Sequence, residues 1–145
     1  MSNVIQGTHF RGSMISWRIV EESSSTVLVE ILQRYAWRYT FYTPLCTDAT
    51  IANGQPILGS NGYDIVCVSN CPTGLTTLGD VLVPCTGYNI GEQYAMGEGR
   101  FTLNIPTNEN FIAAFSNAAW FDLVTGTRLG WSVAVQIQTF KRVGT

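Results

Sequence analysis

The longest apolar-rich run without glycine or proline is Thr26–Tyr42, and its apolar and polar residues alternate. On an extended strand, one side would carry Val27, Val29 and Ile31 and, after Gln33, the series would resume with Tyr35, Trp37, Tyr39 and Phe41. A helical i, i+3, i+4, i+7 spacing from Leu28 also fits, but the β-branched start and the aromatic end favour a strand. Because the run exceeds a usual strand of roughly 5–6 residues, we expect a bend near Gln33–Ala36 or a strand shared by two sheets.

Further strands are expected on both sides of this central run. Ser13–Val20 alternates in the same way and should form a hairpin with Thr26–Arg34 through the short polar link Glu21–Ser25. The other predicted strands are Tyr63–Ser69, Asp80–Val83, Arg100–Ile105, Phe111–Ser116, Trp120–Val124 and Trp131–Phe140. The last has the most regular alternation, and Tyr63–Ser69 with Asp80–Val83 should form a second hairpin. Loops are expected over Leu45–Gly62 and Cys85–Gly99, where glycines and Asn-Gly pairs are frequent.

Many short alternating strands without a convincing long helix indicate an all-β fold. We expect a two-sheet antiparallel sandwich of jelly-roll or Greek-key type, with loops held by disulfides. Residues 1–145 suit a single β-sandwich domain. The start of the chain lacks the charged and apolar regions of a signal peptide, so we expect a mature form or a piece of a longer extracellular chain.

The cysteines Cys46, Cys67, Cys71 and Cys85 lie in the glycine- and proline-rich middle of the chain. Their even number in a loop-rich region predicts two disulfides and an oxidising compartment. A zinc site is the alternative, but no second close Cys or His pair follows Cys67-x-x-x-Cys71. Four cysteines allow three pairings, and a bond between Cys67 and Cys71 inside one short turn is the least expected on geometry.

Composition narrows the partners that the surface can bind. Charged residues make up 12% of the chain, against roughly 25% in an average soluble domain, and the net charge is −2. Such a surface repels copies of itself weakly and favours contacts with neighbours. No basic stripe is present, so nucleic acid is not expected as a partner. The apolar runs are too short for membrane insertion.

Candidate chemical groups are few and scattered. The only histidine, His9, has no acidic neighbour that would orient it as a general base. Asp64, Asp80 and Glu92 could hold calcium if their loops converged, yet no D-x-D-x-D-G loop exists. Gly97-x-Gly99 is interpreted as a turn, since no helix follows it to bind phosphate. We therefore expect no enzymatic activity, no catalytic residue, no cofactor and no metal.

A possible ligand or partner face consists of Trp17, Arg34, Trp37 and Arg38. Arg34 and Arg38 share parity along their strand, and arginines beside tryptophans can bind a carboxylate or a sugar. The alternative is that these arginines pack and pair with Glu30 for structural reasons, which we prefer.

The opening segment Gly7–Gly12, followed by Ile15-Ser16-Trp17-Arg18, resembles the HFRG-x-x-I-x-W-R start of a known domain type. That domain lies at the N-terminus of large, mostly uncharacterised extracellular and cell-surface proteins of invertebrates and some microbes. The similarity continues through the cysteines, Gly97-Glu98-Gly99-Arg100 and Ala118-Ala119-Trp120. The resemblance implies an extracellular location, a longer multidomain chain and adhesive or structural use, without catalytic residues.

Three functions follow from these observations. The first is a structural module that associates with copies of itself or with sibling domains in a surface fibre or layer, because sandwich edge strands can accept another strand. The second is an adhesion receptor domain that binds a protein on another cell. The third is a carbohydrate-binding module, which rests mainly on the use of jelly rolls by lectins. We prefer them in that order.

Overall fold

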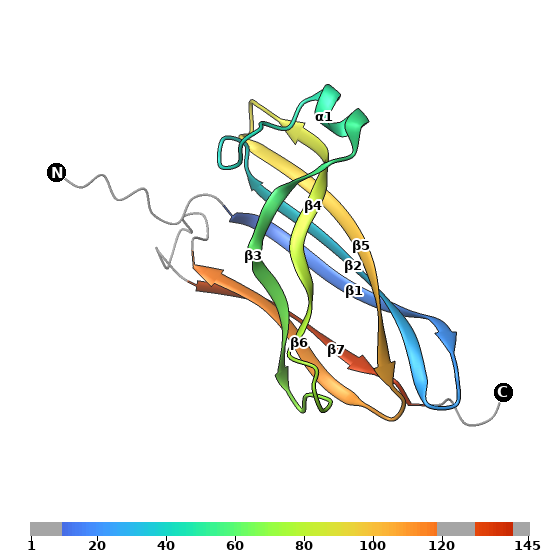
Figure 1. The fold of residues 1–145 in the computed structure, drawn as a ribbon. Coiled ribbons are helices and arrows are strands. Elements are labelled where there is room, and N and C mark those ends of the chain that lie inside the picture. The colour runs from blue at the N-terminus through green and yellow to red at the C-terminus, as the bar shows by residue number, and fades with distance from the viewer. Residues whose placement is uncertain (1–9, 119–129, 141–145) are drawn as a thin grey trace.

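The computed structural model describes residues 10–118 and 130–140. Within these residues the chain forms seven strands and one short helix (Figure 1). The elements are β1 (Phe10–Glu22), β2 (Thr26–Arg38), α1 (Asp48–Asn53), β3 (Pro56–Ser69), β4 (Thr77–Asn89), β5 (Tyr94–Pro106), β6 (Asn110–Ala118) and β7 (Gly130–Gln138). The predicted all-β class is confirmed. The strand expected at Trp120–Val124 lies outside the described residues, as does His9.

All strand pairs are antiparallel, and their order is β1-β2-β5-β4-β3-β6-β7. In this order β3, β4 and β5 are joined as neighbours, and β6 returns to lie beside β3. That arrangement is a Greek key. The two outer strands, β1 and β7, come into contact, and the Trp17 indole N–H donates to the Gln136 carbonyl oxygen over 2.8 Å. The sheet is therefore nearly closed into a barrel.

β4 divides the sheet into two layers that cross in Figure 1. Residues 77–84 of β4 pair with β3, whereas residues 85–89 pair with β5. The first layer thus consists of β1, β2, β5 and the end of β4, and the second layer consists of the start of β4, β3, β6 and β7. The expected sharing of one strand by two sheets occurs at β4 and not at the central run. β2 pairs with β5 without interruption from Thr26 to Arg38.

The core lies between the two layers, and the alternation of β2 builds its centre. The residues of β2 at odd positions from Val27 to Trp37 are all buried, so the predicted inward face is confirmed. Gln33, a polar residue, takes a place in this series and is 3% exposed. On β7, Val133, Val135 and Ile137 face the core or its margin while the residues between them are exposed, as their alternation predicts.

Two segments that were expected to be loops contain regular structure. Leu45–Gly62 holds α1, which begins at a capping box between Thr47 and Thr50 and ends at Gly54 with a φ of 67°. The Asn53-Gly54 pair therefore ends a helix. The strand β3 begins at Pro56, seven residues before its predicted start at Tyr63. Cys85–Gly99 contributes to β4 and β5 and leaves only a short turn between them.

Candidate partner-binding site: the seam between β4 and β5

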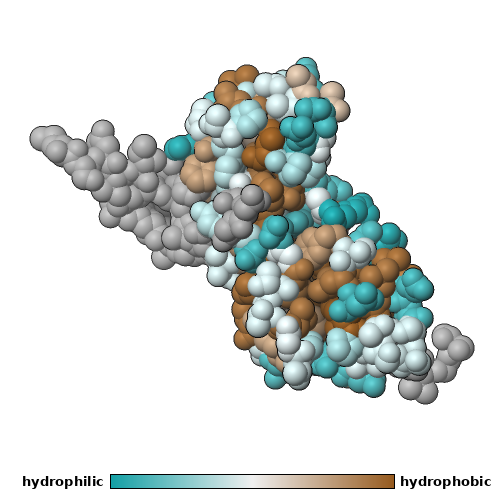
Figure 2. Space-filling model, in the orientation of Figure 1, coloured by the Kyte–Doolittle hydropathy of each residue, from teal (hydrophilic) through white to brown (hydrophobic). Residues whose placement is uncertain are grey.

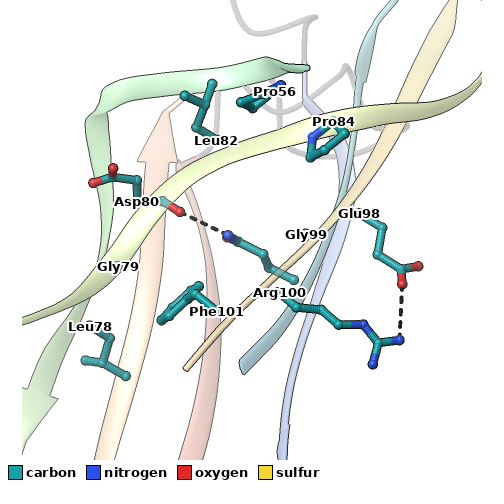
Figure 3. A pocket seen from close by; sticks show the side chains of 11 residues that line it. Pro56, Leu78, Gly79, Asp80, Leu82, Pro84, Glu98, Gly99, Arg100 and Phe101 are labelled. Carbon is teal, nitrogen blue, oxygen red and sulfur yellow. Dashed lines mark hydrogen bonds and ion pairs between the residues drawn. The ribbon is translucent and has the colours of Figure 1, made fainter. Parts of the chain in front are cut away.

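A seam opens where β4 and β5 separate. The β4–β5 ladder ends at the pair Cys85 and Gly97. Beyond this point β4 continues in the second layer, while residues 98–106 of β5 pair, among the described strands, with β2 alone. The seam encloses a hollow of about 780 Å³ (Figure 3). Its lining comes mainly from Leu78–Pro84 of β4 and Glu98–Phe101 of β5.

Two glycines allow β4 to cross over β5 at this point. Gly97 and Gly99 lie on the inner side of β5, and a Cβ atom at either position would clash with Val83 or Pro84 of β4. The interpretation of Gly97-x-Gly99 as a turn is wrong, because both residues lie inside β5. Glycine is required here for close approach of two backbones, which is one of its established uses in strands.

The edge of β5 that faces the seam is open. Within a strand, successive residues direct their N–H and C=O groups to opposite sides. The Gln93 carbonyl accepts from the N–H of Tyr39, directly after β2, whereas the Met96 carbonyl accepts from the Thr86 hydroxyl of β4. Even-numbered residues of β5 therefore direct their backbone groups toward β4. Past the end of the ladder these residues are Glu98, beside the last pair, and then Arg100, Thr102 and Asn104, which face the seam.

Proline positions agree with this assignment. Proline lacks an N–H donor, so within sheets it occurs at edges where no ladder partner needs that donor. Pro106 follows Asn104 at the same parity on β5, and Pro84 occupies the seam-facing parity on β4. Pro84 therefore lies on the seam-facing edge of β4, whereas the Pro106 carbonyl accepts from the Thr139 hydroxyl over 2.7 Å, so the open stretch of β5 ends before Pro106.

The opposite edge, on β4, is partly satisfied by a side chain. The Gln33 amide donates to the Asp80 carbonyl oxygen over 3.0 Å, and the Tyr35 hydroxyl donates to Gln33 Oε1 over 2.8 Å (Figure 3 shows the first bond). Burial raises the pKa of Tyr35 above its usual value, so the hydroxyl stays protonated as a donor. This chain of bonds ties β2 to β4 across the core and leaves β5 as the more open edge.

Apolar side chains reach the surface in the seam. Phe101 points toward Leu78 and Gly79 in Figure 3, and a Cβ at Gly79 would lie 2.7 Å from the Phe101 ring. Leu103, two residues further on the same inner side, is also only partly buried against the core. Figure 2 shows apolar residues gathering at the surface on the side of β4 that faces the far end of β5. A strand edge and exposed apolar side chains thus occur together.

The family model for the N-terminal domain of integrin beta-like proteins A–E matches residues 11–139. The chain belongs to this family. No curated protein and no solved structure matches the chain. The match begins at residue 11, so most of the Gly7–Gly12 motif lies outside it. The family and the disulfides described below support an extracellular or cell-surface domain. This agrees with the location that the resemblance implied.

In this member of the family, the four residues of the expected ligand face do not lie together. Arg34 and Arg38 are on the outer side of β2, but Trp37 is 1% exposed and belongs to the core. Trp17 is half-buried on the inner side of β1, with its N–H bound to Gln136. The reason is parity, because odd positions of β1 and β2 face inward. Arg34 and Arg38 therefore do not share an exposed face with Trp37, whereas Trp17 lines a surface hollow with Arg18 and Arg100.

The outer side of the first layer carries a network of ion pairs. Glu30 contacts Arg18 over 2.9 Å and Arg100 over 3.2 Å, and Glu98 contacts Arg34 over 2.8 Å and Arg100 over 3.5 Å. The hydrogen bond from Arg18 is the main reason that the pKa of Glu30 lies below its usual value. Arg34 therefore pairs with Glu98 and not with Glu30, whereas Arg18 and Arg100 are the arginines that pair with Glu30.

Two carboxylates face each other on β3 and β4. Asp64 lies opposite Asp80 in the ladder, and burial, followed by the hydrogen bond and the charge of Asp80, raises the pKa of Asp64. Glu92 lies elsewhere, in the turn between β4 and β5. Among the described residues, no group of three metal-ligating side chains occurs. Asp64, Asp80 and Glu92 therefore do not come together, as a calcium site would have required.

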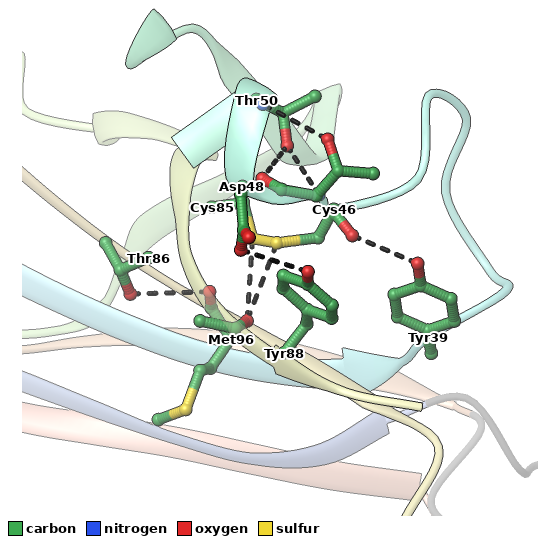
Figure 4. The surroundings of a disulfide bond; sticks show 10 residues. Tyr39, Cys46, Asp48, Thr50, Cys85, Thr86, Tyr88 and Met96 are labelled. Carbon is green, nitrogen blue, oxygen red and sulfur yellow. Dashed lines mark hydrogen bonds between the residues drawn. A yellow bond between two sulfur atoms is a disulfide. The ribbon is translucent and has the colours of Figure 1, made fainter. Parts of the chain in front are cut away.

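The disulfide between Cys46 and Cys85 fixes the point where β4 changes layers (Figure 4). Both cysteines are buried. The Tyr39 hydroxyl donates to the Cys46 carbonyl oxygen over 3.0 Å, and the Tyr88 hydroxyl donates to Asp48 Oδ1 over 3.0 Å. The segment before α1 and the start of the helix are thereby held against β4, beside the closed end of the seam.

The second disulfide joins Cys67 and Cys71, so the pairing that geometry made least expected is the one present. The Cα atoms lie 5.7 Å apart, within the usual range for a disulfide. Asn70, with a φ of 53°, adopts the left-handed conformation and turns Cys71 back beside Cys67. The prediction that all four cysteines form disulfides is confirmed.

Sequence reasoning missed the seam as a site. Its signals were present as the glycines at 97 and 99 and the prolines at 84 and 106. They could be interpreted only with the strand order, because the same residues also mark turns. No helix among the described residues is long and apolar enough to cross a membrane.

Proposed function

We propose that this domain is a non-enzymatic, extracellular adhesion-type module that associates with copies of itself through the seam. The family description names integrin beta-like proteins, which supports an adhesion role at the cell surface. The observation that carries the proposal is the open edge of β5 at Arg100–Asn104 beside the partly exposed Phe101. An unpaired edge next to apolar side chains is the arrangement to which another strand adds.

The chemistry of the seam supports binding more than catalysis. Glu98 and Arg100 are engaged in ion pairs, and the Gln33 amide is bound to Asp80. Among the described residues, those that line the hollow include no serine, threonine, cysteine or histidine, the usual nucleophiles and bases. Self-association through such an edge would build the surface fibre or layer that we infer, when the contacts do not close into a ring.

A carbohydrate-binding role has less support. Lectin-type sites commonly stack a sugar on an exposed aromatic ring, and the buried Trp37 cannot provide one. A glycan array with the wild type and the double variant Arg34→Ala and Arg38→Ala separates the two proposals. A lectin that uses this face would lose glycan signals while keeping its fold. An adhesion module of the proposed type would give no glycan signal with either protein.

Self-association tests the main proposal directly. We expect sedimentation velocity to show species larger than a monomer that increase with concentration, and negative-stain microscopy to show regular assemblies. Beads coated with the native domain should cluster, whereas beads coated with reduced and alkylated domain should stay dispersed. A monomer at all concentrations, together with dispersed native beads, would overturn self-association as the role of the domain.

A further inference from the structure

The open edge of β5 is complementary to itself. We infer that two copies join through β5 as antiparallel strands, with a two-fold axis at Thr102. This inference rests on the self-association proposed above and specifies its contact. A two-fold contact places the same surface of both copies against each other. The first layers of the two copies would then form one continuous sheet, in the order β1-β2-β5-β5-β2-β1.

The backbone of β5 favours this register. The seam-facing residues Arg100, Thr102 and Asn104 are spaced symmetrically around Thr102. With the axis at Thr102, Arg100 of one copy lies opposite Asn104 of the second copy, and all three residues find partners. Since opposed residues in such positions exchange both backbone hydrogen bonds, the contact would form about six of them.

The side chains support the same register. On the outer side, Thr102 would face Thr102 of the second copy, a cross-strand pair that stabilises sheets. On the inner side, Phe101 would lie opposite Leu103 of the second copy. By symmetry, Leu103 would lie opposite Phe101 of the second copy. These two side chains are only partly buried in one copy, so the contact removes apolar surface from water.

The charges along the open edge of β5 are compatible with a second copy of the chain pairing with it. Moving the axis to Arg100, which shifts the pairing by four residues, would oppose Arg100 to itself, which is unfavourable. The register centred on Thr102 places each Arg100 opposite a neutral asparagine. The edge carries no lysine and no proline between Glu98 and Ile105, so the usual protection against strand addition is absent there. The net charge of −2 adds little repulsion between two copies.

The first test removes one seam-facing N–H. Thr102→Pro deletes the donor at the axis, while the matched control Thr102→Ala keeps it. Sedimentation velocity should show at least tenfold weaker dimerisation for Thr102→Pro and a change of less than about threefold for Thr102→Ala. Circular dichroism and urea unfolding of both variants establish that each is folded before they are compared.

The second test uses charge changes to determine which residues of the two β5 strands lie opposite each other. Asn104→Asp would place a carboxylate opposite Arg100 of the second copy and should tighten the dimer about two- to tenfold. Asn104→Lys would oppose two cations and should weaken it by a similar factor. Asn53→Lys, on the exposed end of α1, adds the same charge away from the edge and should leave the dissociation constant unchanged.

The outcomes separate this inference from the proposed function. If the wild type stays monomeric, self-association itself fails. If the wild type associates but Thr102→Pro and Thr102→Ala associate equally well, pairing through β5 is overturned while self-association stands. Equal effects of Asn104→Asp and Asn104→Lys would overturn the register at Thr102.

Discussion

A side-chain carbon at Gly97 would lie 2.5 Å from the carbonyl oxygen of Pro84, a backbone atom of the strand that crosses it. Because this oxygen cannot move without shifting β4, we expect Gly97→Ala to lower the free energy of unfolding by about 1–3 kcal/mol. Urea unfolding measures the change. Gly12→Ala is the matched control, since a Cβ at Gly12 meets nothing within 4 Å. Equal stability of the two variants would contradict the tight crossing.

Gln33 provides a second prediction, because its buried amide links Tyr35 to the Asp80 carbonyl. Gln33→Leu has a similar size and is more apolar, yet it leaves that carbonyl and the Tyr35 hydroxyl without this partner. We expect a loss of about 1–3 kcal/mol in the free energy of unfolding. Combining Gln33→Leu with Tyr35→Phe should restore part of this loss, because the Tyr35 hydroxyl that lost its partner is then absent, although the Asp80 carbonyl still lacks this donor. Additive effects in this double-mutant cycle would argue against the network.

The two disulfides should contribute unequally to stability. Cys46 and Cys85 are separated by 39 residues and Cys67 and Cys71 by 4, so the first bond restricts the unfolded chain more. From loop closure we expect losses of about 4 kcal/mol for Cys46→Ala with Cys85→Ala, and about 2 kcal/mol for Cys67→Ala with Cys71→Ala. Chemical denaturation of the two double variants compares them. A larger loss from the second pair would contradict this order.

Reduction of the intact protein should act locally. We expect faster hydrogen exchange over Cys46–Cys85 than over the β1–β2 hairpin, Ser13–Arg34, because only the first segment is crossed by the disulfides. Mass spectrometry of deuterium uptake before and after reduction gives both rates. Unchanged uptake over Cys46–Cys85 would show that the bonds are not what holds this segment.

Asp64 should make stability depend on pH. Its pKa in the folded protein is raised, mainly by burial and then by Asp80, so the folded state binds a proton more tightly than the unfolded state. The resulting stabilisation is fully present below the unfolded pKa and is lost as the pH rises through the raised folded pKa. We therefore expect the free energy of unfolding of the wild type, minus that of Asp64→Asn, to fall as the pH rises above the ordinary pKa of an aspartate, as measured by urea unfolding. A flat difference would contradict the pairing of these carboxylates.

How far the sequence could predict the structure depends on the range of the interactions. Alternation along β2 and β7 is a local property, and it gave the strands and their buried faces. Gln33 interrupts that alternation, and only the position of β4 explains why an amide is buried there. The Cys67–Cys71 pairing depends on the left-handed conformation of Asn70, which asparagine permits but does not demand.

The candidate site was harder to predict, because it arises where two strands separate. The ligand face proposed from Trp17, Arg34, Trp37 and Arg38 combined residues of opposite parity, so it could not lie on one side of the sheet. The open edge of β5 depends on β4 changing layers at Cys85. Strand order, and therefore the edge, follows from contacts between residues far apart in the chain.

The contact between β1 and β7 also has a mechanical consequence. The two strands run in the same direction in Figure 1, with Phe10 at the start of β1 and Gln138 at the end of β7. Tension applied between these two residues therefore acts along the strands and shears β1 against β2. In shear, all the hydrogen bonds of a ladder resist together, whereas a hairpin pulled apart from one end opens bond by bond. We therefore expect tension applied between Phe10 and Gln138 to be resisted by a whole strand ladder at once.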